Sequence, residues 1–284
     1  MEPLRPSDTA AFTAMLRAAH QIVDGVPKIL DDPISVGLIE GATPESIVAR
    51  RSALLSSQLM VPRAAVVLRS RYAEDLLAQA VDRGTTQFVI LGAGLDTFAF
   101  RQPTFARKLQ IYEVDHPATQ AWKHQRLAAA KLTTPDNLHW SPIDLERQDL
   151  LQGLRKAGFD HSRPAFVSWL GVMQYLTWPT IELTLKAVAA LPGPSTIVMS
   201  FMLPDAALSG SEAAAARAVA DEAAKKGEPW LTRLQPADLA NRLSRLGFRQ
   251  VVHLSPEEAN ARYFAKRDDD LQASHVAQMM SATN

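Results

Sequence analysis

Two glycines and a series of acids stand where apolar segments of this 284-residue chain end. The run QFVILGAGLDTFAFR, residues 87–101, breaks on Gly92 and Gly94 and carries Asp96 two residues later. Glycine lets a chain turn sharply and lets a ligand come close to the peptide plane. A strand that ends in such a turn, followed by a helix start with free N–H groups, is typical of a nucleotide-type site. This motif alone leaves a tight turn without a ligand as the alternative.

Two further acids end the next apolar runs. Asp115 closes YEVD about 20 residues after Gly94, where a carboxylate can accept hydrogen bonds from both hydroxyls of a ribose. Asp144, in SPIDL, ends the following run and can meet the exocyclic amine of an adenine. Each acid alone also fits a solvated residue at a strand end or a helix start. Together with the glycine turn, they indicate a ligand that contains adenosine.

The residue after the glycine turn separates two classes of such ligands. A dinucleotide site is expected to carry a third glycine near Thr97, and this chain has none there. The carboxylate of Asp96 would repel a pyrophosphate at the helix start, but it can accept a hydrogen bond from an ammonium group. This favours S-adenosylmethionine, whose tail is an amino acid. A nicotinamide-dependent oxidoreductase is kept as the alternative.

The elements that must position these residues alternate between strand and helix from residue 87 onward. Strands are expected at 87–94, 109–115, 137–145, 164–170 and 195–203, with two late strands in RQVVHLS (249–255) and ARYFAKR (261–267). Helical patterns separate the early strands. This alternation predicts an α/β fold with a doubly wound, mostly parallel seven-stranded sheet that is covered on both faces.

We expect a single domain over residues 1–284. Residues 1–85 read as an N-terminal helical cap, and residues 86–203 and 233–284 as the core. Residues 204–232 form an alanine-rich helical insertion, which we interpret as a lid over the methyl acceptor. The alternatives for the insertion are a spacer helix or an oligomer contact.

Composition narrows the partners and the cofactors. Lys plus Arg equals Asp plus Glu at 30 each, so the totals give no sign of a nucleic-acid or anionic-membrane binder. The absence of cysteine excludes disulfides, thiolate metal sites and a cysteine nucleophile. No histidine spacing of the HExxH type occurs, and we predict no metal. With no signal-like start and no run of roughly 20 apolar residues, we expect a cytoplasmic protein.

Five motifs give the chain a family resemblance. RSRYAEDLL, QFVILGAGLDTFAFR, YEVDHP, PIDL and WLGVMQYL resemble, in order and spacing, the leucine carboxyl methyltransferase family and its bacterial branch of S-adenosylmethionine-dependent O-methyltransferases. The resemblance runs from about residue 10 to 270 and implies a Rossmann-like methyltransferase sheet. It implies methylation of a carboxylate on a small molecule or a peptide C-terminus, of the natural-product type. The alternatives are a hydroxyl or phenol acceptor, or a donor-binding subunit without catalysis.

The resemblance also implies roles for the matching positions. Arg69, or its neighbour Arg71, matches the arginine that pairs with the carboxylate of the donor's methionine part, and guanidinium and carboxylate form such pairs readily. Counting back from the glycine motif favours Arg69. The other cofactor-binding positions that match are Gly92, Ala93 and Gly94 for the turn, Asp115 for the ribose, and Asp144 with Leu145 for the adenine.

One position departs from the family pattern. Leu170 stands where many members have a glutamate that faces the donor, and a leucine cannot form a hydrogen bond. We expect the backbone there, Trp169 or Gln174 to make that contact. Trp169, Gln174 and Tyr175 are also the candidates for the acceptor wall. A carboxylate acceptor is already ionised at neutral pH and needs no general base, whereas a hydroxyl acceptor needs one.

Overall fold

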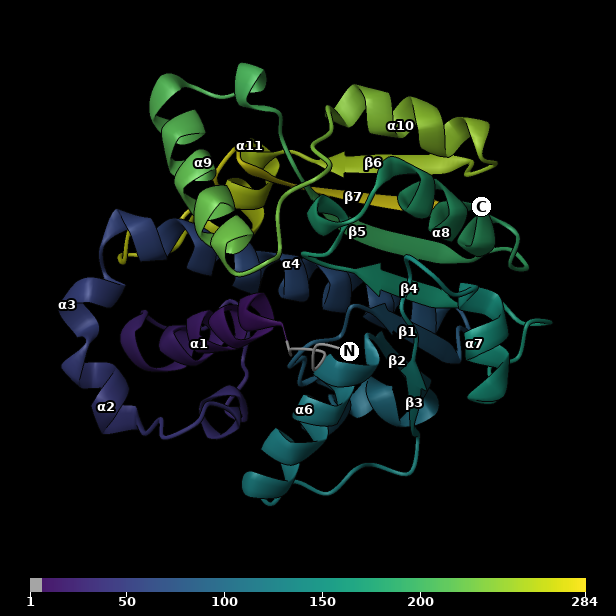
Figure 1. Ribbon diagram of the computed structural model, residues 1–284, viewed down its shortest axis with the longest axis horizontal. Helices are drawn as coiled ribbons and strands as arrows, with labels where there is room; N and C mark the ends of the chain where they lie inside the picture. Colours follow the sequence, from purple (N-terminus) through teal and green to yellow (C-terminus); the bar gives the residue numbers. More distant parts are fainter. Residues whose placement is uncertain (1–6) are drawn as a thin grey trace.

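A seven-stranded sheet forms the centre of the protein in the computed structural model, which describes residues 7–284 (Figure 1). The first six residues of the predicted cap lie outside this range. The strand order is β3-β2-β1-β4-β5-β7-β6. The strands are β1 (Gln87–Leu91), β2 (Gln110–Asp115), β3 (Leu138–Pro142), β4 (Phe166–Trp169), β5 (Thr196–Met202), β6 (Gln250–Leu254) and β7 (Ala277–Thr283). Strands β1 to β5 are parallel, and β7 runs antiparallel between β5 and β6. The predicted doubly wound, mostly parallel α/β fold is confirmed.

The chain reverses its direction of winding next to β1. Strand β1 pairs with β2 on one side and with β4 on the other, both in parallel. The helical connections from these two pairs leave the sheet in opposite directions, which opens a crevice beyond the carboxyl ends of β1 and β4. Every residue of β1 is buried, as expected for a central strand covered on both faces.

Helices cover both faces of the sheet. Helix α4 (Ser57–Asp82) packs against Phe88 and Ile90 of β1. Helices α7 (Leu150–Lys156), α8 (Trp178–Ala189) and α10 (Pro236–Arg245) form the core of the other face with Val89 and Leu91. Alternate residues of one apolar strand therefore belong to two separate cores.

The remaining helical elements are shorter or lie at the edges of the sheet. The α-helices are α1 (Asp8–Val23), α2 (Pro44–Ala49), α3 (Arg51–Leu54), α5 (Phe98–Arg101), α6 (Pro117–Ala129), α9 (Gly210–Lys225) and α11 (Pro256–Ala259). Short turns of 3-10 helix are η1 (Ser35–Leu38), η2 (Thr104–Lys108), η3 (Met173–Tyr175) and η4 (Asp205–Ala207), and η5 (Asn260–Phe264) is a π-helical turn.

The N-terminal helices and α9 gather on one side of the sheet. In Figure 1 the arrowheads of β4 and β6 point toward the side where α1, α2, α3 and α9 lie. A buried ion pair fixes α1 to α4, because the Arg63 guanidinium donates to both carboxylate oxygens of Asp24 at 2.8 Å. The cap is therefore held over the carboxyl ends of the parallel strands, where ligands bind in this class of fold.

The prediction for the last strand is wrong. ARYFAKR was expected as a strand, but the chain there forms η5, which continues from α11. Helix α11 begins at a capping box in which Ser255 accepts from the Glu258 N–H and Glu258 accepts from the Ser255 N–H. The seventh strand of the sheet is instead β7, at the end of the chain. The other late prediction is confirmed, because RQVVHLS forms β6.

No helix among residues 7–284 combines the length and the apolar character that a membrane crossing requires.

Candidate functional site

The glycine turn follows β1 directly and needs glycine at both positions. Gly92 has φ +66° and Gly94 has φ +50°, in the left-handed region that side chains disfavour. The N–H groups of Gly92 and Ala93 both donate to the Val114 carbonyl, at 2.8 and 3.1 Å, which ties the turn to β2. A Cβ at Gly92 would overlap the Val172 side chain, so this glycine also serves packing.

Asp115 lies beside the turn at the end of β2. Its two carboxylate oxygens accept from the N–H groups of Gly94 and His116, the second at 2.6 Å. Burial raises the pKa of Asp115 above its ordinary value, although the two N–H donors oppose this shift. The structure therefore brings together the turn and the acid that the sequence assigned to one ligand.

Arg69 reaches the same region from α4, and its guanidinium makes no hydrogen bond or ion pair within residues 7–284. It packs over Gly171, which has φ +74°; a Cβ built there would lie 2.6 Å from Cζ and 2.7 Å from Nη2 of Arg69. Burial, and then the charge of Arg17, lower the pKa of Arg69 to about 10, while Tyr175 and Asp96 act in the opposite direction. A buried guanidinium without an anionic partner suits the carboxylate of an amino-acid ligand.

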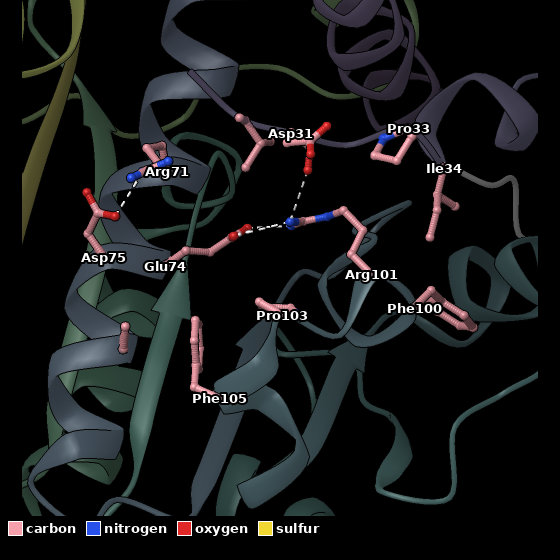
Figure 2. Close-up of a pocket in the computed structure, with 12 residues that line it drawn as sticks. Asp31, Pro33, Ile34, Arg71, Glu74, Asp75, Phe100, Arg101, Pro103 and Phe105 are labelled. Carbon is pink, nitrogen blue, oxygen red and sulfur yellow. Dashed lines mark hydrogen bonds and ion pairs between the residues drawn. The ribbon is translucent and has the colours of Figure 1, made fainter. Parts of the chain in front are cut away.

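Arg71 lies elsewhere. Its side chain is half-exposed, and its Nε donates to Asp75 Oδ1 at 2.8 Å one helical turn away. Residues two apart on a helix face different sides, so only one of the two arginines can reach the strand ends. The structure places Arg69 against Gly171, just after β4, and Arg71 in a separate surface cavity (Figure 2).

The other predicted donor contacts flank this centre. Asp96 accepts from the Phe98 N–H at 2.8 Å, just before the short helix α5. Asp144 follows β3 by two residues, accepts from the Glu146 N–H at 3.0 Å and is partly exposed. Leu145 packs at the edge of the core that contains Val114.

The segment after β4 contains the residues predicted for the acceptor side. Trp169 is fully buried in the core and Leu170 packs against the α4 face, so neither forms an open wall. Gln174 is only 3% exposed; its Nε2 donates to the Gly171 carbonyl at 3.1 Å, and its Oε1 has no partner in the described chain. Tyr175 is half-buried and close enough to Arg69 to affect its pKa.

Helix α1 also contributes to this region, which no sequence pattern indicated. Arg17 donates through Nη2 to the Leu95 carbonyl in the glycine turn and through Nε to Asp32 at 3.0 Å. Ala10 lies against Gly94, where an added Cβ would come within 3.1 Å of it. An arginine in the apolar stripe of α1 was the available signal of a buried charge, but only the fold reveals its partners.

The segment that follows α9 contacts Gln174, one of the residues predicted for the acceptor side. The N–H groups of Leu231 and Thr232 donate to the Gln174 carbonyl at 2.7 and 3.2 Å. The Glu228 carboxylate accepts from the N–H of Thr9, at 3.1 Å, and from its hydroxyl. The predicted lid region therefore contacts both the end of β4 and the beginning of α1.

Within the described range, no group of three or more His, Asp or Glu side chains is arranged to hold a metal ion.

Comparisons with known proteins give consistent findings. Residues 10–189 match the family model described as leucine carboxyl methyltransferase. The Bacillus subtilis (strain 168) protein named "Putative S-adenosyl-L-methionine-dependent methyltransferase YktD" is 36% identical over 208 residues, which cover 72% of this chain and 67% of that protein. A Frankia alni protein named "Putative S-adenosyl-L-methionine-dependent methyltransferase FRAAL5401" is 26% identical over 265 residues, which cover 92% and 77%.

Among solved structures, the fold is similar to that of a protein from Thermobifida fusca YX described as a putative methyltransferase. The TM-score is 0.61 at 17% sequence identity, and the match covers 99% of this chain and 95% of that one. At this level of identity the similarity is one of fold.

Proposed function

This chain belongs to the leucine carboxyl methyltransferase family of S-adenosylmethionine-dependent methyltransferases, and from that premise we propose that it methylates a carboxylate oxygen of a small molecule or a peptide C-terminus. Membership of this family removes the nicotinamide-dependent oxidoreductase as an alternative. The proposal rests on one observation for the donor and one for the acceptor.

The donor observation is the unpaired guanidinium of Arg69. In the proposed complex Arg69 pairs with the carboxylate of the donor's amino-acid part. This pair compensates for the hydration that the guanidinium loses through burial. The free Oε1 of Gln174 then accepts from the donor's ammonium group, and Asp96 adds negative charge nearby. Gln174 would thus take the role of the glutamate that many family members have at the position of Leu170.

Asp115 and the turn hold the adenosine part in this proposal. The Gly94 and His116 N–H groups keep the Asp115 carboxylate in one orientation, and its remaining lone pairs are available to two ribose hydroxyls. Asp144 and Leu145, beyond the neighbouring strand β3, supply a polar and an apolar contact for the adenine.

The acceptor observation is the composition of the segment after β4. Residues 169–176, WLGVMQYL, are the last residue of β4 and the segment after it, and they contain no His, Asp, Glu or Lys; the phenol of Tyr175 is their one ionisable side chain. A carboxylic acid has lost its proton at neutral pH and needs no base, whereas an alcohol needs one. Bound in this site, S-adenosylmethionine would supply the methyl group of its sulfonium sulfur. Transfer to a carboxylate oxygen in one in-line displacement would break the methyl–sulfur bond, leave S-adenosylhomocysteine as the other product and release no proton.

The chain's own contribution to the rate is alignment and exclusion of water. Holding two reactants in the correct geometry can supply about 7–11 kcal/mol of the barrier. Leu231 and Thr232 attach the lid to residue 174, and Glu228 attaches it to α1, so the donor and acceptor regions share one cover. These contacts would exclude water around the reacting oxygen.

The test is a product assay with trideuteromethyl-labelled S-adenosylmethionine. The substrates are aliphatic and aromatic carboxylic acids and peptides with free C-termini, each paired with the alcohol or phenol of the same skeleton. We expect labelled product from carboxylates alone, and we expect mild alkali to remove the label because a methyl ester hydrolyses and a methyl ether does not.

The variant Arg69→Gln should lose this activity. The matched control is Arg249→Gln, which removes an exposed arginine before β6, an edge strand three positions from β4 in the sheet. Alkali-stable label on alcohols or phenols would refute the carboxylate assignment. Donor binding without any labelled product from the panel would favour a donor-binding subunit instead.

A further inference from the structure

A cavity of about 490 Å³ lies beside α4. It is enclosed by the turn at residues 30–34, by α4 between residues 71 and 78, and by the chain from residue 100 to 105 (Figure 2). This volume falls in the range of about 300–1,000 Å³ that is usual for small-molecule sites. Neither Arg69 nor any residue of the glycine turn lines it, so a ligand here would not occupy the donor's place.

Three of the five charged side chains around this cavity already have strong partners. Figure 2 shows Glu74 and Arg101 meeting across its centre. Arg101 donates to both oxygens of the Glu74 carboxylate and, through Nε, to the Thr97 hydroxyl at 3.0 Å. Asp75 accepts from Arg71 Nε at 2.8 Å and from the Tyr263 hydroxyl at 2.9 Å. These contacts hold the three side chains in place, and their formal charges sum to −1.

The other two charged side chains keep free hydrogen-bonding capacity, and their signs are opposite. The terminal nitrogens of Arg71 make no hydrogen bond within the described chain, and its side chain is 47% exposed. The carboxylate of Asp31 has no hydrogen bond or ion pair there either, and the residue is exposed. One cationic and one anionic anchor therefore border the same cavity.

The walls between these anchors are apolar. Phe100, Phe105 and Pro103 line one side, and Pro33 and Ile34 line another. Such walls favour a ligand with an apolar body, because burying that body removes apolar surface from water.

We propose that this cavity is a second ligand site, which binds an apolar α-amino acid or short apolar peptide as a zwitterion. The ligand's carboxylate pairs with the free nitrogens of Arg71, its ammonium group pairs with Asp31, and its side chains pack against Phe100 and Phe105. A guanidinium binds a carboxylate with two parallel hydrogen bonds, which defines the direction in which the ligand lies. Binding at this site needs no methyl donor.

The test is isothermal titration of the full chain with L-phenylalanine and with the dipeptide L-phenylalanyl-L-leucine. Each is compared with its N-acetylated and its C-amidated form. We expect the wild-type protein to bind at least one of the two zwitterions, and each blocked form to bind about fivefold more weakly, since both anchors are partly exposed. The titrations are repeated with saturating S-adenosylhomocysteine, which should leave the affinity unchanged.

Two surface variants assign the anchors. Arg71→Gln should bind the zwitterion about fivefold more weakly, and it should no longer distinguish the free form from the C-amidated form. Asp31→Asn should also bind the zwitterion about fivefold more weakly, and it should no longer distinguish the free form from the N-acetylated form. Ala78→Trp, which fills the cavity from α4, should abolish binding, and Arg249→Gln should not change it. The proposal is overturned if wild-type protein binds neither zwitterion at millimolar concentration, if blocked and free forms bind equally, or if S-adenosylhomocysteine displaces the ligand.

Discussion

The substitution Gly171→Ala separates the role of Arg69 from the general stability of the fold. Gly171 has φ +74°, and a Cβ there would lie 2.6 Å from Cζ and 2.7 Å from Nη2 of Arg69. The obstructing atoms are the far end of a flexible side chain, so the backbone can stay in place while the guanidinium moves away. The variant should therefore fold and lose the position of the group that we assign to the donor's carboxylate.

Two magnitudes follow from this geometry. A non-glycine residue in left-handed backbone costs about 1–2 kcal/mol, which should appear as a loss in the free energy of unfolding. Loss of the charge-assisted hydrogen bonds between Arg69 and the donor's carboxylate costs about 1.5–3 kcal/mol in binding. The dissociation constant of S-adenosylhomocysteine should therefore rise about 10- to 100-fold.

A matched variant supplies the control. Gly158 has φ +88°, but a Cβ there would meet no atom of the described chain within 4 Å. Gly158→Ala should show a similar loss of unfolding free energy in urea denaturation and an unchanged affinity in isothermal titration. If Gly171→Ala binds S-adenosylhomocysteine as tightly as Gly158→Ala, the guanidinium of Arg69 does not hold the donor.

Three further variants test other parts of the structure. Asp115→Asn places an amide nitrogen against one backbone N–H of the turn, so titration should show at least about tenfold weaker binding of S-adenosylhomocysteine. Glu113→Gln leaves the fully buried ammonium of Lys123 without its carboxylate, which should lower the free energy of unfolding at pH 8 by about 3–5 kcal/mol in urea denaturation. His275→Gln should matter only at acid pH: Glu212, and then Glu257, raise the pKa of His275 above its usual 6.5, so their stabilising effect is full below pH 6.5 and is lost as pH rises through the raised pKa. Since His275 is about half exposed, thermal denaturation at pH 5.5 should reveal a loss of no more than about 1 kcal/mol relative to pH 8.5.

Each of these variants has a result that would contradict its basis. Unchanged donor affinity in Asp115→Asn would remove the ribose assignment. The double variant Glu113→Gln with Lys123→Met should recover most of the lost stability, because no charge is then left buried; failure to recover it would mean that the ion pair is not the cause. For His275→Gln, an equal loss of stability at both pH values would show that charge plays no part.

Much of the fold was predictable because its strands are locally distinct. Apolar runs such as QFVIL end at glycine or aspartate and alternate with amphipathic helices, and this pattern alone indicates a parallel sheet. Strand β7 was missed for the opposite reason. Its sequence, AQMMSAT, has few β-branched or aromatic residues, and it becomes a strand because it lies between β5 and β6. ARYFAKR has the aromatic content of a strand, but it follows a capped helix start and continues that helix.

Residues of the candidate site could be predicted where a single segment of sequence identifies them. Gly92, Gly94 and Asp115 are each marked by residue type and by position at a strand end. The contacts of Arg17 with the Leu95 carbonyl and of Glu228 with Thr9 join segments far apart in sequence, so no local pattern predicts them. They arise from the packing of α1 against the glycine turn and of the segment after α9 against α1.

Spacing to the glycine motif favours Arg69 over Arg71, but what each side chain contacts depends on the orientation of α4. Both lie in the same turn of α4 and have the same chemistry. Their surroundings differ, because Arg69 faces Gly171 and Arg71 faces Asp75.

The most direct test of the central claim is a crystal structure of the protein with S-adenosylhomocysteine. The account predicts that the amino-acid carboxylate lies within hydrogen-bonding distance of the Arg69 guanidinium, with the ribose hydroxyls at Asp115 and the ammonium at Gln174 Oε1. An amino-acid end that points away from Arg69, or a ligand that lies outside the crevice between β1 and β4, would contradict it.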